Sequence, residues 1–289
     1  MTERIDSHHH LWRYNVEEYG WISGEMEVLR HDFLPGELGG VLKAQGIDGA
    51  VAVQARQTLE ETAWLLQMAA EHSFIRGVVG WAPLASADFP AMVERLAGNE
   101  RLKGLRHVIQ DEPDDEYILD EEFNRGIDAL KGTGLVYDIL VLERHLPQTI
   151  QFVDRHPEQI FVLDHLAKPR IRDGGIGGST RDSTCNWTRD WKRNLGALAE
   201  RQNVYCKLSG MVTEAHWQNW SVESLRPYFD VALEGFGAGR LMFGSDWPVC
   251  LLAASYERWM GTVEQFVREL SAAEQDRIWG ETAMEVYRL

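Results

Sequence analysis

Short apolar runs alternate along the chain with longer segments in which apolar residues recur every three or four positions. Short runs rich in β-branched residues are typical of buried strands, and the longer segments are typical of helices that bury one face. The runs predict eight strands, at residues 4–6, 49–54, 76–81, 104–108, 135–139, 160–164, 204–208 and 241–243. The helical periodicity predicts helices at residues 60–71, 89–97, 121–130, 146–155, 191–201 and 224–233.

An earlier helix is indicated by boundary signals in the stretch HDFLPGELGGVLKAQG. Asp32 can cap its N-terminus, Pro35 is tolerated in its first turn, and Gly46 ends it. Eight strand and helix units in 289 residues predict an α/β fold, a single-domain (β/α)8 barrel of the TIM type over residues 1–289.

The alternative to a barrel is an open doubly wound sheet, which usually carries a glycine-rich phosphate loop after its first strand. Here that place holds SHHHLW, so the barrel is favoured. The glycine-rich stretch RDGGIGGSTRDSTCNW, at residues 172–187, lacks the spacing of a nucleotide-binding loop and predicts a long loop after the sixth strand.

The chain is acidic, with a formal net charge of −16 and a pI near 5.1. This charge disfavours nucleic acids and anionic membrane surfaces as partners, because both attract clustered Lys and Arg. No apolar run reaches the length of a membrane span and no signal-peptide layout is present, so a cytoplasmic location is expected. Cys185, Cys206 and Cys250 show no paired spacing and are expected to be ordinary thiols. A homo-oligomer is compatible with the sequence.

The histidine run in RIDSHHHLW, residues 4–12, follows the first predicted strand directly. A purification tag is a poor explanation, because there are three histidines and no linker. Side chains alternate in direction along a strand, so His8 and His10 are expected on one side and His9 on the other. They stand at the carboxyl end of the strand, where barrels carry their active sites.

Two further residues are expected at the same face. His165 ends the sixth strand in FVLDHLAKP, and Asp246 ends the eighth in LMFGSDWP. Closure of a barrel brings strand eight beside strand one, which places Asp246 next to His8 and His10. Imidazoles and a carboxylate that converge on one cavity can bind a divalent metal ion or move protons.

The segments DSHHHLW, GLRHV, VLDHLAKP, YCKLSGM and MFGSDWPV together resemble the amidohydrolase superfamily, specifically its amidohydrolase-2 branch with the sugar lactonases. The likeness runs in order over nearly the whole chain. It implies hydrolysis of an aldonolactone of the L-fucono or L-rhamnono type to the aldonic acid. It also implies that Asp246 is the general base, assisted by His165 and Arg106, and that the metal ligands are His8, His10, His165 and Asp246.

The same resemblance implies a substrate pocket near Arg106 and His107, with Trp247, Lys168 and Lys207 close by. Trp81 is a further candidate, because aromatic faces suit the apolar side of a sugar ring. For each of these residues, a purely structural role is the alternative. His107 can be a hydrogen-bonded core histidine, the lysines can lie behind the pocket, and the tryptophans can plug the barrel mouth.

Two departures from the binuclear amidohydrolases bear on the cofactor. Strand four ends in Arg106 and His107 rather than a bridging lysine or glutamate, and strand five, in VYDIL, has no histidine. Two bridged metal ions are therefore not expected. One divalent ion, with zinc as the first candidate, and catalysis without a metal both remain open.

Three rival functions are retained. The first is a metal-dependent decarboxylase, since another branch of the same superfamily uses the same barrel and the same final aspartate. A hydrolase of an anionic lactone, such as a pyrone dicarboxylate or a muconolactone, would need cationic groups, and Arg106, Lys168, Arg170 and Arg172 are candidates. A barrel that binds a sugar acid without catalysis is the third. A serine hydrolase is not indicated, since no GxSxG motif occurs.

Overall fold

The computed structural model describes residues 2–174 and 186–289. Eight parallel strands form one sheet whose strand order follows the chain. All eight predicted strands are confirmed, with ends that differ by at most three residues. They are β1 (Ile5–His9), β2 (Gly49–Val53), β3 (Ile75–Gly80), β4 (Leu102–Val108), β5 (Val136–Leu140), β6 (Phe161–Leu163), β7 (Val204–Leu208) and β8 (Leu241–Phe243).

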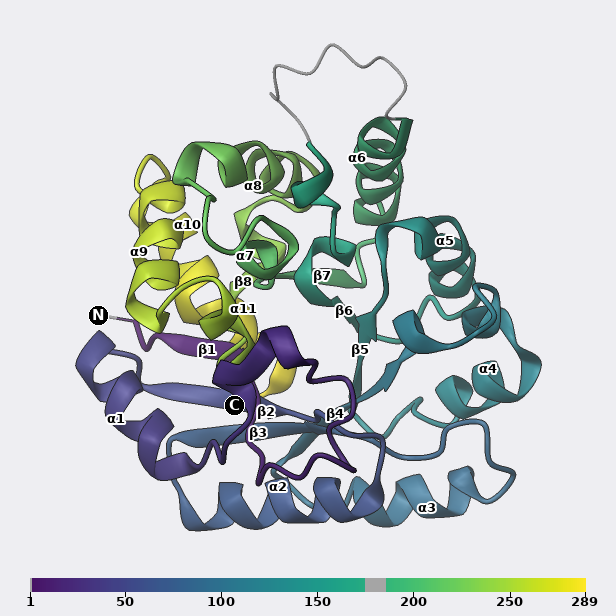
Figure 1. Cartoon of the computed structure of the whole chain (residues 1–289). Helices are drawn as coiled ribbons and strands as arrows, with labels where there is room; N and C mark the ends of the chain where they lie inside the picture. The colour runs from purple at the N-terminus through teal and green to yellow at the C-terminus, as the bar shows by residue number, and fades with distance from the viewer. Residues whose placement is uncertain (1, 175–185) are drawn as a thin grey trace.

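Helices α1 to α6, α8 and α9 follow one another around the outside of the sheet in chain order (Figure 1). Every helix that the sequence predicted is present, and α7 and α9 to α11 were not predicted. The helices are α1 (Pro35–Gln45), α2 (Leu59–Glu71), α3 (Phe89–Leu96), α4 (Glu121–Asp128), α5 (Leu146–Arg155), α6 (Asn186–Ala199), α7 (Met211–Glu214), α8 (Val222–Phe236), α9 (Tyr256–Val267), α10 (Ala272–Asp276) and α11 (Thr282–Tyr287).

The N-terminus of α1 differs from its prediction. The N-cap is Leu34, and Asp32 instead accepts a hydrogen bond from the Tyr14 N–H, 2.8 Å from its Oδ1. Asp32 therefore fastens the preceding segment rather than the helix. Gly46 ends the helix in the left-handed conformation, as expected. The predicted loop at residues 172–187 falls mostly on residues 175–185, which lie outside the described residues, as does Cys185.

The two edges of the sheet meet where β8 ends beside β1. The Asp246 N–H donates to the His8 carbonyl at 2.8 Å, and the His10 N–H donates to the Trp247 carbonyl at 2.6 Å. Asp6 adds a side-chain link, because its Oδ1 accepts the Ser245 N–H at 2.8 Å. The barrel is thus closed at the point where the histidine run meets Asp246.

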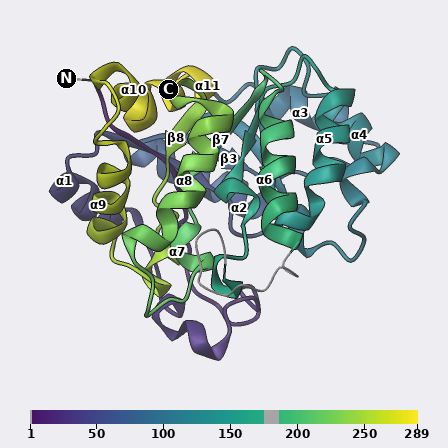
Figure 2. The ribbon, with the colours of Figure 1, turned by 90° about the horizontal axis from the view of Figure 1, so that it is seen from above.

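Apolar side chains pack in two layers. The larger cluster lies between the sheet and the surrounding helices. The smaller one joins strand residues such as Val51, Val136 and Met242 to Val286 and Tyr287 of α11. Since Lys103, near the start of β4, donates to the Arg288 carbonyl at 2.8 Å, this helix lies at the amino ends of the strands. Figure 2 shows α11 and the segment between β1 and α1 at opposite ends of the barrel.

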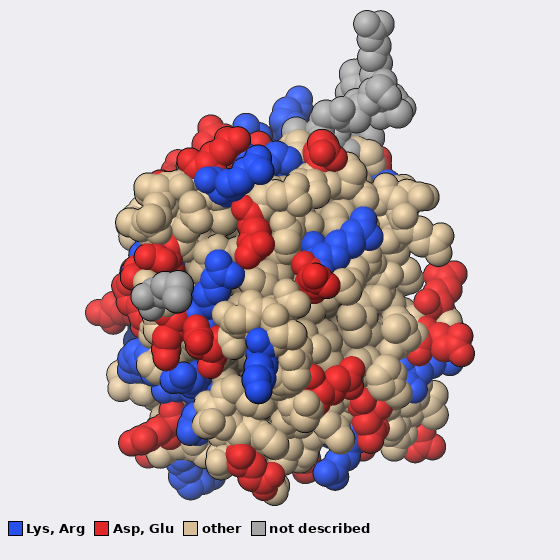
Figure 3. All heavy atoms as spheres, turned by 90° about the vertical axis from the view of Figure 1, so that its left-hand side faces the viewer, with Lys and Arg blue, Asp and Glu red and all other residues tan. Residues whose placement is uncertain are grey.

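On the face in Figure 3, acidic and basic side chains are interspersed, and neither sign forms a continuous patch. Among the described helices, none combines the length and the apolar composition that crossing a bilayer requires. Cys206 and Cys250 are buried free thiols, as predicted.

Candidate active site

A cavity of about 710 Å³ opens at the carboxyl ends of the strands. Its wall combines residues from the strand ends with residues from the segment between β1 and α1. The lining residues are His10, Glu18, Trp21, Ala55, Arg56, Gln57, Thr58, Arg106, Val108, Gln110, Asp111, Leu140, His165, Lys168, Asp246 and Val249. Five predicted site residues therefore line one cavity: His10, Arg106, His165, Lys168 and Asp246.

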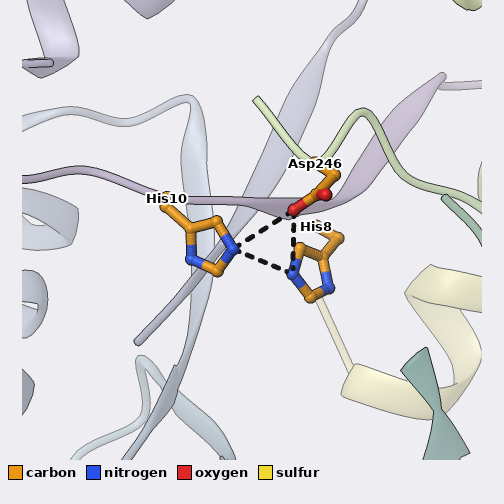
Figure 4. A group of neighbouring side chains, drawn as sticks. All are labelled: His8, His10 and Asp246. Atoms are coloured by element: carbon orange, nitrogen blue, oxygen red, sulfur yellow. Dashed lines mark hydrogen bonds and ion pairs between the residues drawn. The ribbon is translucent and has the colours of Figure 1, made fainter. Parts of the chain in front are cut away.

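His8, His10 and Asp246 form a compact cluster at the base of this cavity (Figure 4). Asp246 Oδ1 lies 3.3 Å from His10 Nε2 and 3.7 Å from His8 Nε2, and the two Nε2 atoms are 3.2 Å apart. The pairing of β1 with β2 shifts between Asp6 and His9, an irregularity that can redirect side chains at a strand end. His9, which lies between them in the sequence, is buried and belongs to neither group of possible metal ligands among the described residues.

His165 enters the cluster through an unusual backbone. Residues His165 to Lys168 all have positive φ, between 47° and 57°, and Asp246 has φ 55°. Left-handed backbone is costly for residues with a Cβ and is concentrated at functional sites. His165 Nε2 reaches to 4.0 Å from Asp246 Oδ1, while its Nδ1 is hydrogen-bonded to the Ser209 hydroxyl at 2.8 Å.

Gly210 makes room for this imidazole. Its φ is +68°, and a Cβ placed there would lie 2.6 Å from His165 Cγ and 2.7 Å from His165 Cβ. A side chain at this position would therefore have to displace the ring. Gly210 and Ser209 follow β7 directly, so the end of one strand fixes the histidine that ends its neighbour.

The donor set of the cluster fits a divalent metal ion. His8, His10 and Asp246 each present one ligand atom within 4.8 Å of the others, and His8, Asp164 and His165 do so as well. Ligands about 2.1 Å from a tetrahedral zinc ion stand roughly 3.4 Å apart, close to the spacings here. His10 Nδ1 lies 2.8 Å from the Val53 carbonyl, so it carries the proton and leaves the Nε2 lone pair free as a ligand.

Behind His8 lies a group of buried charges, which we call the floor network: Arg106, Asp138, Asp164 and Lys207. The Asp164 carboxylate contacts His8 and both cations of the network. Its Oδ1 is 3.3 Å from His8 Nδ1 and 3.0 Å from Lys207 Nζ, and its Oδ2 accepts from Arg106 Nη1 at 2.8 Å. Arg106 also donates to the Gln54 carbonyl. Two cations face two carboxylates, so the network has no net charge when all four are ionised.

The protonation states follow from burial and from these neighbours. Burial lowers the pKa of His165 to about 4 and lowers the pKa of His8 well below its usual range, so both are neutral near pH 7. Burial acts to raise the pKa of Asp246, but His165, His10 and Lys168 outweigh it and hold that pKa below its ordinary value. Asp246 is therefore a carboxylate beside the neutral imidazoles of His8 and His165, the state that a general base requires.

Several predicted residues do not line the cavity. His107 Nε2 lies 2.7 Å from Glu112 Oε1, and Trp81 Nε1 donates to His107 Nδ1 at 3.3 Å. Successive residues of a strand point to opposite faces, so His107 lies on the face of β4 opposite to Arg106. His107 is thus a hydrogen-bonded core histidine, although its partner is a carboxylate rather than backbone. Trp247 is buried against Phe33, with ring centroids 5.1 Å apart.

The two lysines differ. Lys168 lines the cavity, whereas Lys207 is fully buried below it and lies 3.1 Å from His8 Nδ1. Direct substrate contact by Lys207 would require it to leave two carboxylates, so its position favours a role through His8. Arg170 pairs with Glu143 at 2.6 Å, and Arg172 lies over the Trp217 ring at 5.4 Å.

Residues on both sides of the cluster were not predicted from the sequence. Glu18, Trp21, Arg56 and Gln57 line the cavity and, with Lys168, form what we call the rim. The first two come from the segment between β1 and α1, which has no strand or helix periodicity to flag it. Asp138 was missed within VYDIL, although a carboxylate in an otherwise apolar strand was an available signal.

The fold and the site define a class. A barrel of eight parallel strands with two histidines after β1, one after β6 and an aspartate after β8 is the arrangement of the amidohydrolases. A family model described as Amidohydrolase matches residues 5–289, and the chain belongs to this family.

Individual relatives narrow the comparison. L-fucono-1,5-lactonase of Burkholderia multivorans is 43% identical over 294 residues, covering 99% of this chain and 96% of its own. L-fucono-1,5-lactonase of Burkholderia ambifaria is 37% identical, covering 100% of this chain and 97% of its own. A crystal structure of an amidohydrolase from Burkholderia multivorans with bound Zn has a TM-score of 0.91 and 41% identity, with 99% of each chain covered.

Proposed function

We propose that this protein hydrolyses a neutral sugar lactone, with an L-fuconolactone as the first candidate and an L-rhamnonolactone as the second, to the aldonic acid. One observation carries the proposal: an ionised Asp246 lies among His8, His10 and His165 at the base of a cavity of about 710 Å³. The two lactonases that match this chain over 96% and 97% of their own length support the substrate class.

In the proposed reaction, Asp246 accepts a proton from a water molecule that the histidines orient, and the water oxygen attacks the lactone carbonyl carbon. The carbonyl oxygen becomes negative, and Arg106 and Lys168, which also line the cavity, are the candidate donors. One such preorganised donor contributes about 3 to 4 kcal/mol. The ring C–O bond then breaks, and the proton on Asp246 passes to the departing ring oxygen. The products are a hydroxyl group and a carboxylic acid.

His8, His10 and Asp246 would hold one divalent ion, with His165 beside them. The Zn in the related crystal structure supports zinc as that ion. A bound ion supplies positive charge that lowers the pKa of a nearby water and polarises a carbonyl group. Asp246 keeps its role as the proton acceptor in either case.

Charge pairing favours a neutral lactone over a dicarboxylate. Arg56 lies 2.7 Å from Glu18 Oε2, and Arg106 lies 2.8 Å from Asp164 Oδ2. Among the described residues that line the cavity, Lys168 is the cation without an ion-pair partner within 4.0 Å. An anionic lactone with two carboxylates would leave at least one of them without a free cation, whereas paired charges still hydrogen-bond hydroxyl groups.

The test is a panel of lactones assayed by acid release: L-fucono-1,5-lactone, L-rhamnono-1,4-lactone, a pyrone dicarboxylate, and δ-valerolactone, which lacks hydroxyls. The two sugar lactones are expected to have the highest kcat/KM. The same preparation, stripped with a chelator and reloaded with Zn²⁺, is expected to lose and regain activity. Preference for the dicarboxylate, or carbon dioxide release from a dihydroxybenzoate with no lactone hydrolysis, would overturn the proposal.

A further inference from the structure

Tyr287 lies two residues from the C-terminus, yet it reaches the charges beneath the active site. Its hydroxyl donates to Asp138 and lies 2.9 Å from both carboxylate oxygens. The side chain is buried, and Lys207 Nζ lies 5.5 Å from the centre of its ring. The helix that carries it, α11, lies at the end of the barrel opposite the segment between β1 and α1 (Figure 2).

A continuous set of contacts leads from this hydroxyl to His8. Asp138 Oδ2 lies 2.5 Å from Lys207 Nζ, and that ammonium lies 3.1 Å from His8 Nδ1 and 3.0 Å from Asp164 Oδ1. Asp138, Lys207 and Asp164 have no exposed surface. Because solvent cannot replace a missing partner at this depth, each group depends on the next for its position.

We propose that Tyr287 is a positioning residue of the active site: through Asp138 and Lys207 it fixes the Nδ1 side of His8 and so aims His8 Nε2 at Asp246. Only the kinetic test of this role rests on the proposed function. Without the hydroxyl, Asp138 keeps Lys207 as its partner and draws it away from His8 and Asp164. Outer partners of this kind change activity about 10- to 100-fold when they are removed, and the low end is expected here because Tyr287 acts through two intermediaries.

A purely structural explanation is that Tyr287 only closes the barrel end, since its ring packs in the smaller apolar cluster. Tyr287→Phe separates the two explanations, because it keeps the ring and its packing and removes only the oxygen. Tyr137→Phe is the matched control. Tyr137 is also fully buried and lies next to Asp138 on β5, but alternation turns it to the other face, where it packs on Phe123 and Phe152.

The experiment combines steady-state kinetics with NMR of the histidine side chains. For Tyr287→Phe we expect kcat about tenfold lower with KM within twofold, at an equal fraction of folded protein. We also expect the ring nitrogen signals of His8, assigned with His8→Gln, to shift. Tyr137→Phe should change neither. Asp138→Asn should move both readouts in the same direction as Tyr287→Phe, and it decides the question if Tyr287→Phe does not fold.

The NMR readout needs neither substrate nor metal, so it stands even if the wild-type protein hydrolyses no lactone in the panel. Unshifted His8 signals in both Tyr287→Phe and Asp138→Asn would overturn the positioning role. A lower melting temperature of Tyr287→Phe with an unchanged kcat per folded molecule would also overturn it. That result is expected if Tyr287 only closes the end of the barrel.

Discussion

The floor network and the rim lie on opposite sides of the catalytic cluster, and they are built differently. In the floor network, Asp138, Asp164 and Lys207 have no exposed surface, and each charge has an opposite charge within 3.0 Å. At the rim, Trp21 is 41% exposed, and Glu18 and Arg56 form a partly exposed ion pair. Buried charges that lose a partner cost several kcal/mol, whereas exposed pairs contribute about 0 to 1 kcal/mol.

This difference suggests a division of labour. The floor network holds the imidazoles in a single arrangement and tolerates few substitutions, so it is suited to chemistry that every substrate shares. Residues at the rim can change at little cost in stability, so they are suited to deciding which lactone enters. Changes near the floor should therefore alter kcat, and changes at the rim should alter KM.

Asp246→Asn should have the largest effect, because it removes the proposed base where the floor meets the cavity. General base catalysis is worth about 10²- to 10⁴-fold, and a fall in kcat of that size is expected with little change in melting temperature. Asp111→Asn is the control, since Asp111 also lines the cavity but is exposed to solvent. Near wild-type turnover by Asp246→Asn would reject the assigned base.

Gly210→Ala comes next. The added Cβ would lie 2.6 Å from His165 Cγ, so the ring must move, and a misplacement of about 1 Å can cost on the order of 10²-fold in rate. We expect kcat to fall about 10- to 100-fold. Gly46→Ala carries a similar positive φ, +66°, with open space around its Cβ, and so reports the backbone penalty alone. Equal kcat in the two variants would show that the position of His165 is not critical.

Trp21→Ala tests the rim. Its exposed ring lines the cavity and offers an apolar face to a sugar ring, so its loss should raise KM about 3- to 10-fold with kcat nearly unchanged. If Trp21 aligns hydroxylated sugar rings, the rise in KM should be absent with δ-valerolactone, which has no hydroxyl groups. Val16→Ala, in the same segment but away from the cavity lining, serves as control. A fall in kcat at constant KM would contradict the division of labour.

Glu61→Gln should have the smallest effect on activity and a measurable effect on stability. Burial raises the pKa of Glu61 to about 7, and its Oε2 accepts the N–H groups of Ala55 and Arg56, which glutamine can also accept. Between about pH 5 and 7 the folded protein holds a proton that the unfolded chain has released, so stability falls as the pH rises. The wild type should lose on the order of 2 kcal/mol across this range.

Denaturant unfolding at pH 5 and pH 8 measures this loss. The Glu61→Gln protein should lose less than the wild type, and its kcat should be unchanged. Glu60→Gln, at the exposed neighbouring position, should retain the pH dependence of the wild type. The same pH dependence in Glu61→Gln and the wild type would show that Glu61 is not the group responsible.

The barrel could be predicted because its signals are local. Apolar runs and helical periodicity gave each strand within three residues, and chain order then placed His8, His10, His165 and Asp246 at one end. The prediction for Asp32 was wrong, since its carboxylate binds the Tyr14 N–H rather than the start of α1. A capping residue and a loop anchor have the same local signature, and only the position of the partner distinguishes them.

By itself, the sequence determined the strand order and the four side chains that meet at the catalytic face, because alternation along a strand and closure of a barrel follow from backbone geometry. The tertiary structure decided what stands behind and in front of them. Asp138 and Tyr287, which are 149 residues apart, meet inside the barrel, and Glu18 meets Arg56 at its mouth. Such contacts depend on the packing of elements that are distant in the chain, which no local pattern of residues encodes.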